Sequence, residues 1–478
     1  MTKRAWLAVT GLLLLNAAGA AAEHVAGLPV HIDRLDSRAI RVWLGDHISS
    51  TATVAIATDE GVVVLDTTGD PRMDRELRRI IARELGRDDF KYLINTHEHS
   101  DHTGGNAVYA DCVIVGHARV AEGMIAQRER QAQNLEYAKS YLAELEGQLA
   151  AARADSLAAA KLSEQVTRTR LTLDARESSA DLHPPTKTFT GRLDLRVGDT
   201  TFELYDIGGM HSASDIAVLV PEHGLLMTGD TMADVWLTDT PGCLASFMAR
   251  PGVPHDFPRM LANWDLLLAR KDAVRKLVPG HWNGELSWAG FAARVDYVRA
   301  LWEGVKQGVA AGKGLAELQR EYALQARFPE LAASPGFSGY NNYTSILEMW
   351  SDATGQESAA DRLYGLVEEG AADDAIGQIV ATRDANSSPY YFLEEQINLA
   401  GYRFLREEKV EQAIRMFRIN VELFPQSWNV YDSLGEGMLR SGDAAAAAAM
   451  YEKSLALNPD SPSGREALAR IRGEPEGR

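Results

Sequence analysis

Short apolar runs separated by turn residues fill much of the chain between residues 28 and 281. Runs of this length, bounded by glycine, asparagine or aspartate, are typical of buried strands. The pattern predicts strands over residues 61–65, 90–96, 201–205, 224–229 and 276–280. After residue 281 the apolar positions recur at helical spacing, so we expect helices from there onward.

A polar, helical segment interrupts the strand pattern at residues 118–182. One apolar stripe consists of Leu135, Leu142, Leu145 and Leu149, and a second one runs from Leu157 through Val166 after a break at residues 154–156. The spacing predicts an inserted helical hairpin. Two roles remain open for it: a solvated decoration, or a dimer arm or wall over the mouth of a site.

The helical C-terminal part contains a repeat with an offset of 34 residues, preceded by a helical connecting region at 315–388. The matching pairs are Gly401 with Gly435, Ala413 with Ala447, Phe417 with Tyr451, Leu423 with Leu457, and Pro425 with Pro459. Period and residue types resemble tetratricopeptide repeats, which we expect over 389–472, capped by residues 371–383 or 463–472. The repeats could bind a partner chain or pack on the preceding domain.

The first residues have the pattern of a secretory signal peptide. Lys3 and Arg4 precede a short apolar run, and small residues follow up to Ala22. We expect cleavage after Ala22 and a periplasmic or secreted protein. We expect no membrane span after cleavage, because no other stretch is long and apolar enough to cross a bilayer.

Composition narrows the possible partners. The 478 residues carry a formal net charge of −18, which argues against nucleic acid or an anionic membrane surface as the main partner. Only two cysteines occur, Cys112 and Cys243, so no disulfide framework is expected. We expect two separate thiols, and a single bridge between them stays open.

The densest group of metal-binding side chains lies in residues 97–102, directly after a predicted strand and before two glycines. Its potential ligands are His97, His99, Asp101 and His102. On such a loop the first two can point to one side and the last two to another, so one segment can serve two adjacent metal positions. Imidazole and carboxylate groups suit zinc.

Three further potential ligands end other apolar runs: His211, Asp230 and His281. The four places, in this order, resemble the metallo-β-lactamase superfamily over roughly residues 28–300. The resemblance implies an α/β fold, an αββα sandwich over residues 23–314. It also implies one zinc ion held by His97, His99 and His211 and a second held by Asp101, His102 and His281. Asp230 would bridge the two ions.

A bridging aspartate resembles glyoxalase II, lactonase and phosphodiesterase relatives. The true zinc β-lactamases of the superfamily commonly have a cysteine there or lack a bridging ligand, which weakens an antibiotic-hydrolase interpretation. The flavodiiron oxygen reductases place a glutamate where His99 stands, and they add a flavodoxin domain of which this sequence has no sign. Redox chemistry is therefore disfavoured.

We expect a hydrolase that attacks a small ester, lactone, thioester or related bond with a hydroxide shared by two zinc ions and oriented by Asp101. β-Lactam hydrolysis is the alternative. An alternative of another class is an interaction protein that works through its repeats, with the hydrolase domain as a scaffold. Asp66 is expected to orient a ligating histidine, and His255 could approach the site.

Overall fold

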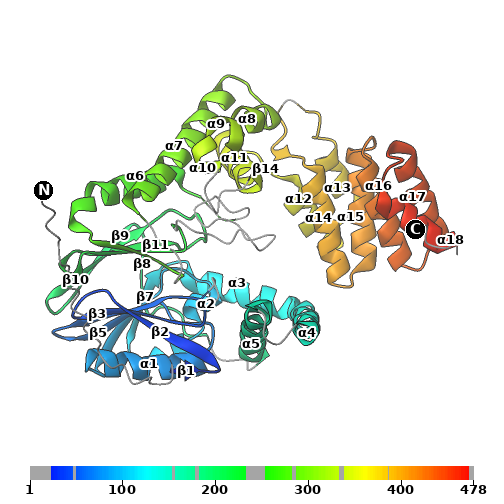
Figure 1. Ribbon diagram of the computed structural model, residues 1–478. Helices are drawn as coiled ribbons and strands as arrows, with labels where there is room; N and C mark the ends of the chain where they lie inside the picture. Colours follow the sequence, from blue (N-terminus) through cyan, green and yellow to red (C-terminus); the bar gives the residue numbers. More distant parts are fainter. Residues whose placement is uncertain are drawn as a thin grey trace, which may run out of the picture. The chain divides into compact units, whose positions relative to one another are not determined.

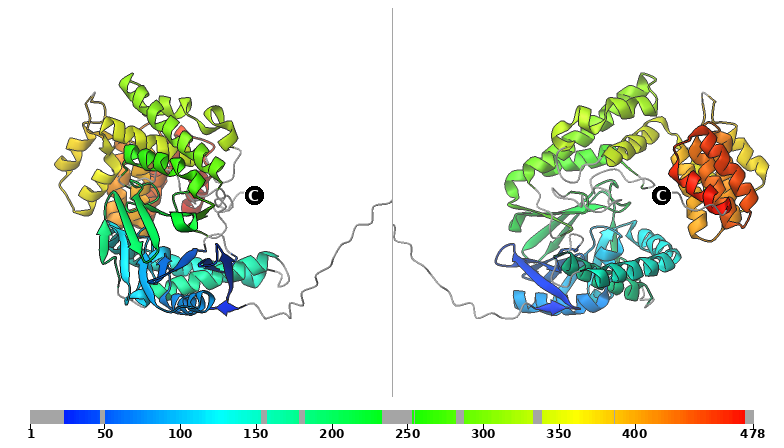
Figure 2. Two further views of the ribbon diagram at one scale, coloured as in Figure 1. Left: turned by 90° about the vertical axis from the view of Figure 1, so that its left-hand side faces the viewer. Right: turned by 45° about the vertical axis from the view of Figure 1, so that its right-hand side comes forward.

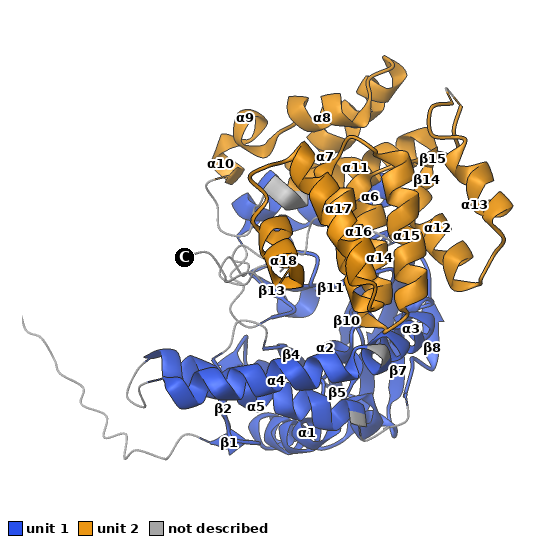
Figure 3. Cartoon of the chain, turned by 90° about the vertical axis from the view of Figure 1, so that its right-hand side faces the viewer, with its two compact units in different colours: residues 1–296, 334–336 blue, residues 297–333, 337–478 orange. Residues whose placement is uncertain are grey.

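The computed structural model describes residues 23–46, 50–152, 157–177, 182–232, 253, 255–281, 287–332, 339–385 and 387–472. The predicted signal peptide and Cys243 lie outside the described residues. Contacts divide the chain into two compact units, residues 1–296 with 334–336 and residues 297–333 with 337–478 (Figure 3). This division falls inside helix α7 (Trp288–Ala310), whereas the sequence predicted a boundary at residue 314. One continuous helix belongs to both units, and no break in the sequence pattern marks that point.

The first unit contains an eight-stranded sheet whose strands follow one another in chain order. Strands β1 to β5 pair in antiparallel fashion, and β5 to β8 pair in parallel fashion. Helix α1 (Pro71–Leu85) supplies the crossover from β5 to β6. The strands are β1 (His24–Val25), β2 (Leu28–Arg34), β3 (Ala39–Leu44), β4 (Thr53–Thr58), β5 (Gly61–Leu65), β6 (Phe90–Ile94), β7 (Val113–His117) and β8 (Lys187–Phe189).

A second, five-stranded sheet follows in the order β13-β12-β11-β10-β9. Strands β9 to β12 form an antiparallel meander. Strand β13 follows helix α6 (Phe257–Ala269) and pairs in parallel with β12. The strands are β9 (Arg192–Val197), β10 (Thr200–Asp206), β11 (Ile216–Val220), β12 (Leu225–Gly229) and β13 (Lys276–Pro279).

The two sheets stack face to face, with α1 on the outer side of the first and α6 on the outer side of the second (Figures 1 and 2). The alternation along β5 explains this arrangement, because successive side chains of a strand point to opposite faces. Val63 and Leu65 pack in the core between the sheets, and Val62 and Val64 pack in the core that contains Leu77 of α1. The predicted αββα sandwich is confirmed.

The insert between β7 and β8 contains the predicted hairpin and one further helix that the sequence pattern did not predict. The three helices are α3 (Val120–Gln133), α4 (Leu135–Ala151) and α5 (Leu157–Glu177). Helices α4 and α5 pack on each other as the predicted hairpin, while α3 contacts the short helix α2 (Ser100–Thr103). Asn134 separates α3 from α4 and donates its side-chain amide to the Arg130 carbonyl at 2.8 Å. Such local bonding competes with helix continuation.

The second unit is helical apart from one short parallel pair, β14 (Glu357–Ser358) with β15 (Tyr390–Tyr391). The helices of this unit after α7 are α8 (Leu315–Glu321), α9 (Leu324–Arg327), α10 (Pro329–Ala332), α11 (Gly339–Thr354), α12 (Ala359–Glu368), α13 (Asp373–Val380), α14 (Glu394–Arg406), α15 (Val410–Leu423), α16 (Trp428–Arg440), α17 (Ala444–Leu457) and α18 (Pro462–Arg472). None of the described helices of the chain combines the length and hydropathy needed to cross a membrane.

The 34-residue repeat falls on two successive helix pairs, α14 with α15 and α16 with α17. A Cβ atom on Gly401 would lie 2.3 Å from the Phe417 ring, and one on Gly435 would lie 3.2 Å from the Tyr451 ring. The paired glycine and aromatic positions thus sit at the close approach of each pair. One hydrophobic core runs from Ala359 to Leu434, so the predicted boundary at residue 389 falls inside it. Membership of the tetratricopeptide class stays a prediction.

Candidate metal centre

All seven predicted ligands meet at one edge of the sandwich, because each follows the end of a strand. The loop after β6 supplies His97 and His99 and leads into α2, which carries Asp101 and His102. His211 lies in the loop between β10 and β11, Asp230 directly follows β12, and His281 follows β13. Their ligand atoms form three overlapping groups: His97 with His99 and His211; His97 with His102 and Asp230; Asp101 with His102 and His281.

The first group consists of three imidazoles. His99 Nδ1 lies 3.0 Å from His97 Nε2 and 2.9 Å from His211 Nε2. His97 and His211 are buried, and His99 is half-buried. The three nitrogen atoms converge on one point from separate directions, since the rings of each pair are close to perpendicular.

The group of Asp101, His102 and His281 contains the carboxylate predicted to orient the nucleophile. Asp101 Oδ2 lies 3.6 Å from His102 Nε2 and 3.7 Å from His281 Nε2. The Asp101 side chain is 48% exposed, whereas those of His102 and His281 are 0% and 8% exposed. The site is therefore open to solvent on the side of Asp101.

Asp230 lies between the group of His97, His99 and His211 and the group of Asp101, His102 and His281. Its Oδ2 is 3.0 Å from His281 Nε2, 3.4 Å from His211 Nε2 and 4.0 Å from His97 Nε2. Its Oδ1 is 3.5 Å from His102 Nε2. The aspartate thus faces histidines of both groups, as a bridging ligand must.

The separations fit zinc. Zinc–nitrogen bonds of about 2.0–2.1 Å in a tetrahedral site place neighbouring ligand atoms about 3.3 Å apart. His102 Nε2 and Asp230 Oδ1 are both buried, face each other at 3.5 Å, and have no hydrogen-bond partner among the described residues. Buried polar atoms normally have a partner. A cation between them would satisfy both, and histidine with carboxylate is the donor set that zinc accepts.

Burial and charge shift the pKa values of the histidines in opposite directions. Burial, together with His102 and His99, holds the pKa of His97 well below its usual value. Burial alone would lower the pKa of His102, but Asp230 and Asp101 raise it well above that value.

The carboxylate of Asp230 responds to the same contacts. Burial alone would raise the pKa of Asp230, but His281 and His102 hold it well below its usual range. Asp230 is therefore an anion that needs positive charge around it.

Asp66 makes the contact predicted for it. It follows β5 with φ +57°, a left-handed conformation that is uncommon outside glycine. Its carboxylate accepts hydrogen bonds from Thr96 N at 2.8 Å, Thr96 Oγ1 at 2.7 Å and His102 Nδ1 at 2.9 Å. Because His102 Nδ1 donates to Asp66, His102 Nε2 keeps its lone pair for a metal ion.

Asp215 supports His211 and was missed by the sequence reasoning. Its buried carboxylate accepts hydrogen bonds from the backbone N–H groups of Met210, His211 and Ser212, at 2.9, 2.7 and 2.9 Å. Burial raises the pKa of Asp215 to about 7. The only signal in the sequence is an aspartate placed shortly after serines in a predicted turn, which is too common to single out.

Gly280 was also missed. A Cβ atom there would lie 2.2 Å from Asp230 Oδ1 and 3.0 Å from the Gly229 carbonyl carbon. Glycine is therefore required beside the bridging position. His255, the further candidate, lies with Nδ1 3.0 Å from the Gly209 carbonyl, in contact with the loop that carries His211.

Part of the chain matches a known protein family. The family model described as Metallo-beta-lactamase superfamily matches residues 48–281. A curated relative, 2,4-dinitroanisole O-demethylase subunit alpha from Nocardioides sp. (strain JS1661), is 26% identical over 243 residues, which is 50% of this chain and 55% of the relative. The chain thus spans about half the length of the curated relative that it matches.

Solved structures with similar folds include a metallo-beta-lactamase from Pontibacter korlensis, at 18% identity and TM-score 0.36, over 56% of this chain and 97% of that one. The inverting sec-alkylsulfatase Pisa1 from Pseudomonas sp. is similar at 13% identity and TM-score 0.47, over 94% of this chain and 66% of that one. All seven clustered side chains lie within residues 48–281, which the family model matches. The chain therefore contains a domain of the metallo-beta-lactamase superfamily, whose members are generally hydrolases.

Proposed function

We propose that the chain is a zinc-dependent hydrolase with two metal positions, acting on a small ester, lactone, thioester or related bond. The placement of Asp230 between two groups of ligands carries this proposal. His97, His99 and His211 would hold one ion, and Asp101, His102 and His281 the other. Two bound zinc ions supply a nucleophile from water near neutral pH and polarise the oxygen of the scissile bond.

The chain's own residues orient the reactants. Asp101 Oδ2 faces the histidines, so its other oxygen can accept a hydrogen bond from water on the open side of the site. Asp66 fixes the ring of His102, and Asp215 fixes the loop of His211. Such supports keep the ligands in place during turnover.

Acyl bonds with an oxygen or sulfur leaving group suit this site better than β-lactams. The histidines that face Asp230 are all assigned to metal in this proposal, so none of them is left to donate a proton to an amide nitrogen. The demethylase relative adds one further candidate, an aryl methyl ether, to the bonds that merit testing.

Zinc content and turnover test the proposal together. We expect close to two zinc equivalents per chain and turnover of a lactone, ester or thioester well above that of a penicillin or carbapenem. Asp230→Ala should lose zinc and most turnover, because the histidines of both groups lose their shared anion. Asp111→Asn changes an exposed carboxylate and serves as the control. Native zinc content and full turnover in Asp230→Ala would refute the two-metal assignment.

We also propose that the protein is exported. The sequence of residues 1–22 supports this proposal, with a basic start, an apolar run and a small-residue end. The mature protein should begin at Glu23, which the intact mass of material from the periplasm or culture medium measures. A mass that includes Met1 would contradict it.

The alternative that the chain is an interaction protein predicts no bound zinc. The zinc measurement therefore distinguishes this alternative from the proposed enzyme.

A further inference from the structure

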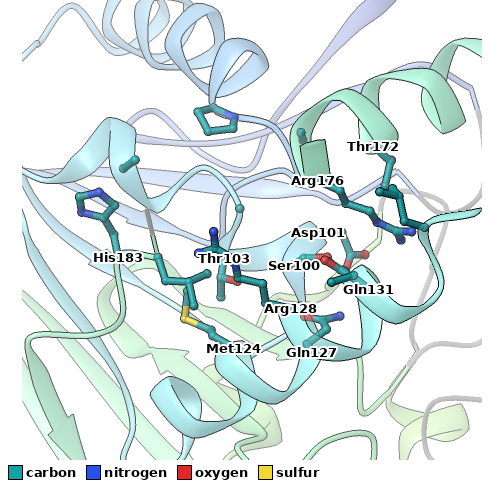
Figure 4. A pocket seen from close by; sticks show the side chains of 18 residues that line it. Ser100, Asp101, Thr103, Met124, Gln127, Arg128, Gln131, Thr172, Arg176 and His183 are labelled. Atoms are coloured by element: carbon teal, nitrogen blue, oxygen red, sulfur yellow. The ribbon is translucent and has the colours of Figure 1, made fainter. Parts of the chain in front are cut away.

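A pocket of about 380 Å³ opens beside Asp101, whose side chain is 48% exposed. Helix α2 contributes Ser100 and Asp101 to its lining, α3 contributes Arg128 and Gln131, and α5 contributes Arg176. Gln131 Nε2 donates to Ser100 Oγ at 2.8 Å, which links α3 to the helix that carries Asp101. Figure 4 shows Arg176 of α5 among the side chains that line the pocket, together with Ser100 and Asp101. The insert thus forms a wall of the site.

Helix α5 presents one continuous face to the surroundings of Asp101. A smaller pocket of about 180 Å³ shares Asp101 and Thr172 with the first one and is lined by Arg168. Arg168, Thr172 and Arg176 are spaced by four residues, so they lie on the same face of the helix. The face carries two guanidinium groups, one in each pocket.

The two guanidinium groups differ in their partners. Arg168 pairs with Glu164 at 3.0 Å and also donates to Ser50 Oγ at 2.5 Å. Arg176 forms no ion pair with any described residue, and its Nε is buried without a hydrogen-bond partner. Burial lowers the pKa of Arg176, with no carboxylate to offset it. Arg128, in the same pocket, likewise has no acidic partner within the described part of the chain.

An unpaired, half-buried arginine is unusual in a chain with more acidic than basic residues, since 67 Asp and Glu face 49 Lys and Arg. Removing a cation from water without a counter-ion costs free energy, which an anionic ligand would offset. Apolar side chains, Met124, Leu135 and Leu182, complete the wall of the pocket. The pocket therefore combines a cationic end with an apolar lining.

We propose that this pocket binds a carboxylate carried by the substrate, with Arg176 as its main partner and Arg128 as a second one. The apolar body of the substrate would lie against Met124, Leu135 and Leu182, which brings the scissile bond to Asp101. The inference rests on the proposed hydrolase function and assigns its substrate class, acyl compounds with a free carboxylate. The planar guanidinium suits a carboxylate because it can donate two parallel hydrogen bonds.

A matched pair of substrates tests the assignment. 4-Acetoxybenzoate and 4-acetoxybenzamide share the ester bond and shape but differ in charge. We expect Arg176→Gln to lower kcat/KM for the acid by about 10-fold or more, the scale of a lost charged hydrogen bond, and to leave kcat/KM for the amide nearly unchanged. Arg128→Gln, on an exposed side chain that poses no risk to folding, should lower the acid's value by a smaller factor.

Arg170→Gln is the control, because Arg170 lies on the same helix but pairs with Glu146 and does not line either pocket. It should leave both substrates unchanged. An equal loss for the acid and the amide in Arg176→Gln, or no loss for either, would overturn the proposal.

Calorimetry with 4-hydroxybenzoate and 4-hydroxybenzamide on the full chain separates this inference from the proposed function. If neither ester is turned over but the acid binds more tightly than the amide and loses this advantage in Arg176→Gln, the carboxylate site stands and ester hydrolysis fails. Equal binding of acid and amide, or an advantage that survives in Arg176→Gln and Arg128→Gln, would refute the carboxylate site even if the esters are hydrolysed.

Discussion

At the scale of single residues, the space beside Asp230 decides whether the ligands can meet. Gly280 leaves room for Asp230 Oδ1. The hydrogen bond from His102 Nδ1 to Asp66 turns His102 Nε2 toward the carboxylate of Asp230. Gly280 and Asp66 are not among the proposed metal ligands. Both act by holding a ligand where an ion can bind it.

Gly280→Ala should therefore weaken metal binding. The new methyl group would displace Asp230 or the adjoining Gly229 backbone, and we expect zinc affinity to fall by about 10- to 100-fold, as when groups that orient ligands are lost. A competition titration against a chromophoric chelator measures it. Gly147→Ala is the control, because a Cβ atom there meets nothing within 4 Å. Unchanged affinity in Gly280→Ala would contradict the role assigned to Asp230.

Asp206, at the end of β10, is a buried carboxylate outside the metal centre. Burial alone would raise its pKa, but His117, whose Nε2 lies 3.3 Å from Oδ2, and hydrogen bonds from the Gly191 and Gly208 backbone N–H groups hold the pKa of Asp206 well below its usual range. Arg259 Nη1 also donates to it at 2.8 Å. A lowered pKa means that ionised Asp206 stabilises the fold at neutral pH.

This stabilisation should be present above the unfolded pKa of about 3.9 and lost as the pH falls below it. Asp206→Asn should lower the free energy of unfolding at pH 7 by about 1.5–3 kcal/mol. The difference from the wild type should shrink as the pH falls from 4 toward 2. Urea unfolding of both proteins at several pH values measures it, and a difference that does not vary with pH would exclude the charge as its cause.

At the scale of elements, the helix pairs of the second unit depend on glycine at their closest approach. Phe417 of α15 is fully buried and lies against Gly401 of α14. The repeat pattern in the sequence predicted this pairing of glycine with an aromatic ring. A side chain at residue 401 would have to push the two helices apart.

The same substitution should have opposite effects at two glycines of this unit. Gly401→Ala should destabilise it by about 1–3 kcal/mol through overpacking against Phe417. Gly377→Ala, in α13 with nothing within 4 Å of the new atom, should stabilise it by up to about 1 kcal/mol through helix propensity. Thermal unfolding measures the change in stability of each variant relative to the wild type. A Gly401→Ala variant that is more stable than the wild type would rule out the close packing.

At the scale of the whole molecule, the boundary between the chain's two units falls within α7. The hydrophobic core formed by α12 to α16 contains residues from both sides of residue 389. Leu363 and Ile376 precede that residue, and Ile397 and Phe404 follow it, all in one hydrophobic cluster. A cut at residue 389 separates them. A cut after Gly355 lies before the cluster begins.

A chain that ends at Gly355 should stay soluble and retain its zinc, because the cluster from Ala359 to Leu434 is removed whole. A chain that ends at Pro389 should retain zinc but bind a hydrophobic dye and aggregate, because Leu363 and Ile376 lose their partners. Zinc analysis, dye binding and light scattering of the two truncations compare them. Equal solubility of both would show that α12 and α13 need no support from α14.

The sequence by itself predicted most of the strands and helices and the seven side chains that the structure brings together. Strand and helix patterns are local, and the histidines and aspartates are recognisable by their spacing after predicted strands. Only the tertiary structure decided which oxygen of Asp230 faces which histidine, that Asp215 and Gly280 support the site, that the insert has a third helix, and that Arg176 faces a pocket without a partner. These features join residues far apart in the chain, and packing, which no local periodicity encodes, sets their distances.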